Sequence, residues 1–197
     1  MPKLGGIFRR RKTPEKSNLT HDVSAPLHSD WSWRPALWAS DAALIAPIKS
    51  GEGIAGSKVF HDCPAGALSV KSNGGEVEVD LKEFGGGFAS LVFDLPEPAC
   101  AELSNGHLLR LEVATEVPRG VTLFGRLNLR QGPNCNQVLR EFMVEPGRLA
   151  VDFDLVLAEL EIAPVDGGWV DLIIETRGGV VICIADLSMS RRPRAAL

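Results

Sequence analysis

Hydrophobic and polar residues alternate with a period of two over most of the chain from Ser57 onward. The apolar positions hold mainly Val, Leu, Ile and Phe, and clusters of Gly, Pro, Asn or Asp separate the runs. A period of two is typical of β-strands with one buried face, and the separating residues favour turns. The pattern predicts about ten strands, at residues 58–62, 67–71, 76–81, 88–95, 108–115, 121–130, 137–144, 149–158, 169–175 and 180–190.

The alternation also assigns side chains to faces. In 121–130, Leu123 and Leu127 fall on one face, and the opposite face receives Phe124, Arg126, Asn128 and Arg130. In 149–158 the apolar residues at odd positions oppose Asp152 and Asp154. Each predicted sheet therefore has one buried and one solvated face, as antiparallel sheets commonly do.

Helical patterns are weak throughout the chain. The best candidate is a short helical turn within 38–48, before Pro47. Strands that follow one another without intervening helices argue against a parallel α/β sheet. We therefore predict an all-β fold, an antiparallel two-sheet β-sandwich of jelly-roll or galactose-binding-like type.

Charge and composition divide the chain into four parts. Residues 1–28 are basic, polar and aperiodic, which predicts a disordered tail. Residues 29–56 form a Trp-rich arm, residues 57–190 the sandwich, and residues 191–197 a basic C-terminal tail. A basic tail can contact phosphates or anionic lipids, but a solvated tail is the interpretation we favour.

The arm contains three tryptophans within eight residues. Trp31, Trp33, Arg34 and Trp38 can pack over the edge of a sheet, or they can anchor a protein partner, because Trp and Arg dominate binding hot spots. We favour packing within the chain and retain partner docking or homo-oligomerisation as the alternative.

Composition restricts the class of protein. The chain has 197 residues, of which 45% are hydrophobic and 23% charged, so one domain with a substantial core is expected. A net charge of −4 gives no basic field for nucleic acid. We find neither a signal-peptide pattern nor a run near the ~20 apolar residues of a membrane span, and we expect a cytoplasmic protein. The four scattered cysteines are then reduced, with Cys183 a small core residue.

The polar faces provide the leading candidate site. If the strands 121–130 and 149–158 are neighbours, Arg126, Asn128, Arg130, Asp152 and Asp154 share one surface with Phe124. Planar polar side chains beside an aromatic ring suit carbohydrate binding. The alternative is a solubilising face with cross-strand ion pairs.

Enzymatic and metal motifs find little support. His61 and Cys63 share a face of an extended strand but lie about 6.6 Å apart along it, too far for a nucleophile and its base. Gly85, Gly86 and Gly87 precede a strand instead of a helix, which argues against a phosphate loop. The aspartates match no calcium-binding loop. We therefore expect no cofactor and no metal.

Four sequence segments resemble an uncharacterised alphaproteobacterial family, a domain of unknown function. They are Trp31 to Trp38, Phe60 to Pro64, Arg126 to Asn134 and Asp186 to Ala195. The resemblance runs from about residue 30 to the C-terminus and implies a bacterial, cytoplasmic protein and one intact domain. It implies no activity or site.

Three hypotheses for function follow, in order. The first is a non-enzymatic β-sandwich binding module for a glycan or a glycan-like polar surface. The second is a structural or assembly protein, such as an accessory or spike component of a phage-like particle. The third is an enzyme of unknown type.

Overall fold

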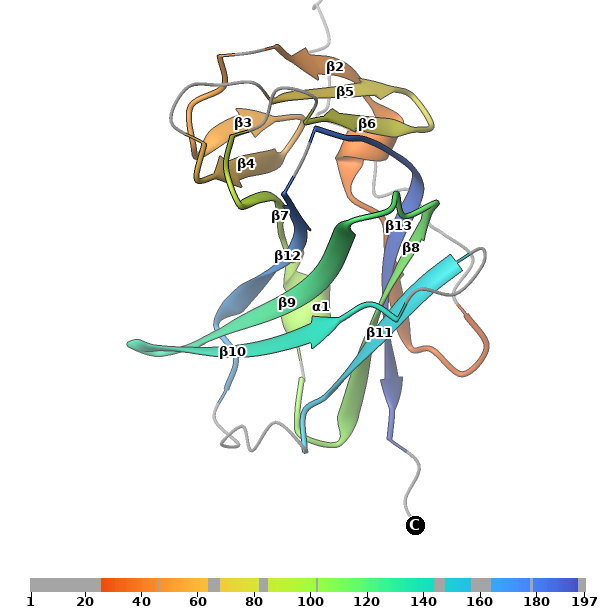
Figure 1. The fold of residues 1–197 in the computed structure, drawn as a ribbon. Helices are drawn as coiled ribbons and strands as arrows, with labels where there is room; N and C mark the ends of the chain where they lie inside the picture. The colour runs from red at the N-terminus through yellow and green to blue at the C-terminus, as the bar shows by residue number, and fades with distance from the viewer. Residues whose placement is uncertain are drawn as a thin grey trace, which may run out of the picture.

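Two antiparallel β-sheets pack face to face in the computed structural model (Figure 1), which confirms the predicted all-β sandwich. The structure describes residues 26–45, 47–63, 68–81, 85–101, 103–143, 148–156, 164–177 and 179–194. Residues 1–25, most of the predicted tail, lie outside these ranges.

Within the described residues, the first sheet has seven strands and the second has six. The first follows the order β11 (Arg148–Asp154), β8 (His107–Thr115), β13 (Val181–Pro193), β6 (Val77–Asp80), β5 (Ser69–Asn73) and β2 (Asp41–Leu44), with β1 (Trp31–Trp33) also on β13. The second follows the order β10 (Asn134–Glu141), β9 (Val121–Gln131), β12 (Gly167–Thr176), β7 (Phe88–Asp94), β4 (Ser57–His61) and β3 (Glu52–Ile54).

Apolar residues at alternate positions fill the space between the sheets. On β9 and β8 the inward positions include Leu123, Leu127 and Leu111, and each is at most 3% exposed. Gly125 interrupts this series because the two layers are closest there. A Cβ atom at Gly125 would lie 3.1 Å from side-chain atoms of Leu111, Val151 and Phe153.

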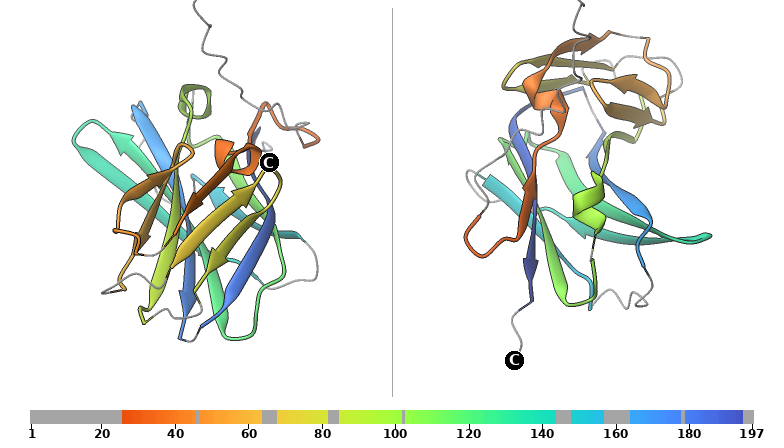
Figure 2. Two further views of the ribbon diagram at one scale, coloured as in Figure 1. Left: turned by 90° about the horizontal axis from the view of Figure 1, so that it is seen from above. Right: turned by 180° about the vertical axis from the view of Figure 1, so that it is seen from behind.

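Two short helices complete the described fold. The 3-10 helix η1 (Ala36–Ala39) packs on β5, and α1 (Glu97–Cys100) contacts β1 of the first sheet and β12 of the second. The right-hand view of Figure 2 shows α1 beside the opening between the sheets. Arg191 secures it there, since its Nη1 donates to the carbonyl oxygen of Ala101 at 2.6 Å.

Each of the ten predicted strands corresponds to one of β4 to β13, with ends that differ by a few residues. The predicted helical turn within 38–48 is wrong in place, because η1 ends at Ala39 and β2 follows at Asp41–Leu44. The strands β1, β2 and β3 were missed. They contain only three or four residues each, too few to show alternation, and they form by pairing with β13, β5 and β4.

The Trp-rich segment is built into both sheets. Trp38 is 3% exposed, packs on Phe93 with ring centroids 5.7 Å apart, and donates from Nε1 to the carbonyl oxygen of Ile184 at 3.0 Å. Trp31 and Trp33 are half-buried and stack with centroids 6.4 Å apart. Arg34 forms an ion pair with Asp186, Nε to Oδ1, at 2.9 Å.

Two predictions near the C-terminus require correction. The predicted tail begins too early, because β13 continues to Pro193 and includes Arg191, whose Nε pairs with Asp30 Oδ1 at 3.0 Å. Cys183 is exposed instead of being a core residue, since its neighbours Ile182 and Ile184 take the inward positions of β13. All four cysteines lie in described segments, with Cys63 half-buried, Cys100 buried and Cys135 exposed. Among the described residues, no helix has the length and apolar character that crossing a bilayer requires.

We expect Trp38→Ala to lower the free energy of unfolding by about 3–5 kcal/mol, because it leaves a cavity in the core and an unpaired carbonyl at Ile184. Urea unfolding followed by circular dichroism measures the change. Leu139→Ala is the control, because Leu139 is 50% exposed, and it should change stability by no more than about 0.5 kcal/mol. Equal stabilities of the two variants would contradict the assignment of Trp38 to the core.

Candidate functional site

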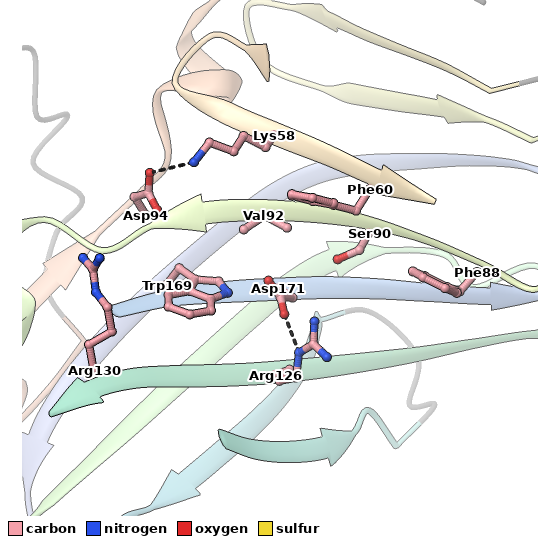
Figure 3. A pocket seen from close by; sticks show the side chains of 10 residues that line it. All are labelled: Lys58, Phe60, Phe88, Ser90, Val92, Asp94, Arg126, Arg130, Trp169 and Asp171. Carbon is pink, nitrogen blue, oxygen red and sulfur yellow. Dashed lines mark hydrogen bonds and ion pairs between the residues drawn. The ribbon is translucent and has the colours of Figure 1, made fainter. Parts of the chain in front are cut away.

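The outer face of the second sheet carries a hollow of about 450 Å³, which we call the central hollow (Figure 3). Its side chains come from four adjacent strands, β4, β7, β12 and β9. They are Lys58, Phe60, Phe88, Ser90, Val92, Asp94, Arg126, Arg130, Trp169 and Asp171. Strands distant in sequence thus contribute to one surface.

Strand register brings these residues into rows. Asp171 of β12 lies opposite Arg126 on β9 and Val92 on β7, and Val92 lies opposite Lys58 on β4. In the next row Trp169 lies opposite Asp94. Side chains alternate strictly between the two faces of a strand. Residues paired directly across neighbouring strands therefore point to the same face, and so do the residues two positions further along each strand.

The floor of the central hollow is polar and deeply buried. Asp171 has no exposed surface, and Ser90 is 3% exposed. Phe60 and Phe88, by contrast, remain 40% and 36% exposed. Figure 3 shows Asp171 between the indole of Trp169 on one side and the ring of Phe88 on the other, with Phe60 beside Ser90.

Asp171 is held by two donors. Arg126 donates from Nε to Oδ2 at 2.5 Å, and Asn128, itself fully buried, donates from Nδ2 to the same oxygen at 3.2 Å. Burial raises the pKa of Asp171, and the hydrogen bonds and charge of these donors oppose that rise. Oδ1 of Asp171 and Oγ of Ser90 are buried and have no hydrogen-bond partner among the described residues.

Two glycines determine how β12 enters the site. A Cβ atom at Gly168 would lie 2.5 Å from the carbonyl oxygen of Asn128, so only glycine allows β12 this close to β9. Gly167 has a φ of +153°, and a Cβ there would lie 2.9 Å from Nη2 of Arg130. The pair brings Trp169 and the Arg130 guanidinium to one end of the central hollow.

The other end is positioned by the segment after β4. Asp62 accepts hydrogen bonds from the backbone N–H groups of Gly87 at 2.9 Å and Phe88 at 3.1 Å, which fixes the start of β7. The His61 ring turns away to the carbonyl oxygen of Ile48, 2.8 Å from Nε2. Asp62 therefore orders the backbone that carries Phe88.

The rim carries a loosely held ion pair. Lys58 Nζ lies 3.6 Å from Asp94 Oδ2, and both side chains are more than half exposed. Exposed pairs of this kind contribute only about 0–1 kcal/mol. Breaking the Lys58–Asp94 ion pair so that either side chain can contact a bound molecule therefore costs little free energy.

The structure separates the predicted ligand-binding residues into two groups. Arg126 and Arg130 line the central hollow, and Phe124 lies on the same face of β9 without lining it. Asn128 is buried beneath this face, so its expected exposure is wrong, because its amide bonds to Asp171 and to backbone carbonyls.

Asp152 and Asp154 belong to the first sheet, on β11, and do not join the central hollow. Arg110 donates two hydrogen bonds to Asp152, from Nε to Oδ1 and from Nη2 to Oδ2, each at 2.8 Å. Nη2 of Arg194 lies 3.4 Å from Oδ2 of Asp154. These are cross-strand ion pairs, the alternative interpretation of that face. No group of three or more metal-ligating side chains occurs in the described ranges.

Sequence reasoning missed several residues that line the central hollow. Trp169 and Asp171 alternate with Val170 and Leu172, which are fully buried, so the period of two could have assigned them to an outer face. The alternation could not show that β12 lies between β9 and β7. That neighbour relation brings Phe60 and Phe88 to the same surface.

We expect Asn128→Ala to reduce the free energy of unfolding by about 1–3 kcal/mol, since it removes a donor from Asp171 and from two carbonyls in a buried site. Urea unfolding provides the measurement. Gln137, the exposed cross-strand neighbour of Asn128, offers a matched amide control as Gln137→Ala. A loss in the control as large as that in Asn128→Ala would show that the buried amide has no special role.

The raised pKa of Asp171 makes a prediction about pH. A raised pKa means that the folded protein favours the protonated carboxyl of Asp171. The contribution of Asp171 to the free energy of unfolding is therefore fully present below the ordinary pKa of 3.8, and it is lost as pH rises through the raised pKa. Asp171→Asn cannot ionise. The stability of the variant relative to the wild type should therefore increase as pH rises above about 3.8, as measured by urea unfolding. A difference that is constant with pH would contradict the shift.

Comparison with solved structures finds similar folds at low identity. The chain is similar to a family 11 carbohydrate-binding module from Clostridium thermocellum, with 9% identity, coverage of 79% of this chain and 99% of that chain, and a TM-score of 0.47. It is similar to the xylan-binding module CBM15, with 10% identity, coverage of 79% and 100%, and a TM-score of 0.46. It is also similar to the xyloglucanase domain of NopAA from Sinorhizobium fredii, with 10% identity, coverage of 83% and 100%, and a TM-score of 0.44.

Sequence comparison identifies the family. No curated protein matches the chain. A family model does match, over nearly the whole length, which confirms the resemblance to an uncharacterised family seen in the sequence motifs. The chain belongs to the family of unknown function DUF6478, which it matches over residues 10–197.

Proposed function

We propose that this protein binds a glycan in the central hollow of the second sheet. The observation that carries the proposal is the pairing of buried Asp171 with partly exposed Arg126 beside the ring of Trp169. Asp171 contributes a free carboxylate oxygen, and Arg126 uses only Nε toward it, which leaves its terminal amino groups facing the central hollow.

The chemistry of the central hollow matches that of a sugar ring. A pyranose has apolar C–H faces, which pack on aromatic rings, and an equatorial rim of hydroxyls, each of which donates and accepts. Trp169 and Phe60 offer rings, while Asp171 and Arg126 offer an acceptor and planar donors. Hydrogen bonds to such charged groups are the stronger kind.

The charges favour a neutral polar ligand. Asp171 pairs with Arg126, and Asp94 pairs with Lys58, so two of the three cations that line the central hollow are matched by carboxylates. A ligand without hydroxyls would leave the buried oxygens of Asp171 and Ser90 unpaired, and sites with buried polar groups reject such ligands strongly. A polyol satisfies them.

Affinity gel electrophoresis against mixed-linkage β-glucan, xylan, dextran and alginate tests the proposal. The wild type is expected to be retarded by at least one polymer. Trp169→Ala should weaken the apparent affinity at least about tenfold, which corresponds to ~1.4 kcal/mol. The loss of the stacking surface is the physical reason.

The control is Arg110→Ala, which truncates a strand arginine paired with Asp152 on the outer face of the first sheet. It should migrate like the wild type, and urea unfolding should show that both variants are folded. Retardation that survives Trp169→Ala, or that is lost equally in the control, would contradict binding in the central hollow.

A further inference from the structure

We infer that the ligand of the central hollow is an extended chain of several sugar units lying along β7 and β12. This inference rests on the proposed function and adds the class of glycan. The shape of the binding surface depends on the class of glycan. A monosaccharide or a chain terminus needs a single subsite, whereas a long chain needs an extended groove. The outer face of the second sheet has the surface that a long chain requires.

Two further hollows adjoin the central one. The first has a volume of about 580 Å³, shares Phe88 with the central hollow, and adds Thr122, Glu175 and Arg177. The second has a volume of about 670 Å³ and shares Lys58, Asp94 and Arg130 with the central hollow. It extends to α1, where Glu97 and Cys100 line it. Because neighbouring hollows share residues, they adjoin one another, and we treat the three together as one groove.

The three hollows follow one another along the strand direction. On β12, Gly167 and Gly168 line the hollow near α1, Trp169 and Asp171 line the central one, and Glu175 lines the hollow at the far end. Gly167 and Glu175 are eight residues apart, which is about 26 Å at ~3.3 Å per residue in a strand. The groove is therefore several times longer than a single pyranose ring.

The aromatic rings are distributed along this length. Trp169 lies opposite Asp94, Phe60 opposite Ser90, and Phe88 opposite Glu175. Counted along β7, the row of Phe60 is four residues from that of Trp169, about 13 Å, and the row of Phe88 is six residues away, about 20 Å. One sugar ring cannot stack on two rings so far apart. Successive units of a chain can.

The groove is also polar at both ends. Thr122, Glu175 and Arg177 line one end, and Glu97 and Asp166 line the other. The side chains of Glu175, Arg177 and Glu97 are exposed, so they can reach the hydroxyls of the outer units without a large desolvation cost. A single sugar bound at Trp169 would leave these groups without a role.

Isothermal titration calorimetry with a length series tests the inference. The probes are the di-, tetra- and hexasaccharides of whichever polymer retards the wild type in gels. We expect the association constant to rise at least about tenfold from disaccharide to hexasaccharide, since longer chains reach more of the groove. Phe88→Ala should reduce the ratio of the hexasaccharide to the disaccharide constant at least about twofold, as expected for the loss of one stacking contact. Leu139→Ala, on β10 and outside all three hollows, should leave the ratio unchanged.

The outcomes separate the inference from the proposed function. If the disaccharide and hexasaccharide bind equally well, the inference is wrong although glycan binding stands. If Phe88→Ala leaves the ratio unchanged while Trp169→Ala lowers both constants, the chain does not follow β7 and the inference is again wrong. If no polymer retards the wild type, the proposed function fails, and the inference fails with it.

Discussion

A carboxylate without exposed surface on the outer face of a sheet is the constraint from which the candidate site is built. Asp171 sits on the central strand β12, where only a partner on an adjacent strand can offset the cost of burying its charge. Arg126 supplies that partner from β9, and Asn128 supplies a second hydrogen bond from two residues further along. Both donors act on Oδ2, so Oδ1 has no hydrogen-bond partner among the described residues. The pairing that stabilises this buried carboxylate is therefore also the feature on which the proposed glycan binding rests.

The two outer faces of the sandwich use charge differently. On the first sheet, Arg110 and Arg148 pair with Asp152 and Asp186 across strands, and the charges satisfy one another at a half-exposed surface. On the second sheet, the carboxylate of the charged pair is fully buried, and aromatic rings line the same hollow. Low dielectric strengthens the interactions of the remaining polar atoms. The first face thus has the paired charges of a solubilising surface, and the second has the features on which the proposed glycan binding rests.

The tryptophans divide in a similar way between structure and surface. Trp38 joins the sheets, packing on Phe93 of the second sheet and donating to the carbonyl of Ile184 on the first. Trp169 belongs to an outward position of β12, and the glycines before it allow β12 to approach β9 closely enough to hold the ring at the end of the hollow. The residue type is the same, but the direction of the side chain from its backbone decides the role.

The sequence by itself determined the strands β4 to β13, the inward and outward faces of β9 and β11, and the family, because alternation and turn residues are local properties of the chain. The position of Arg126 on an outer face belongs to this group. Only the tertiary structure decided that β12, and not β11, neighbours β9, and that Trp169, Asp171 and Phe88 therefore join Arg126 while Asp152 and Asp154 join Arg110. It also decided that Asn128 is buried, although alternation alone places it outward. Strand pairing depends on contacts between residues distant in the chain, and a pattern with period two is compatible with any strand as neighbour, so no local signal could have made these choices.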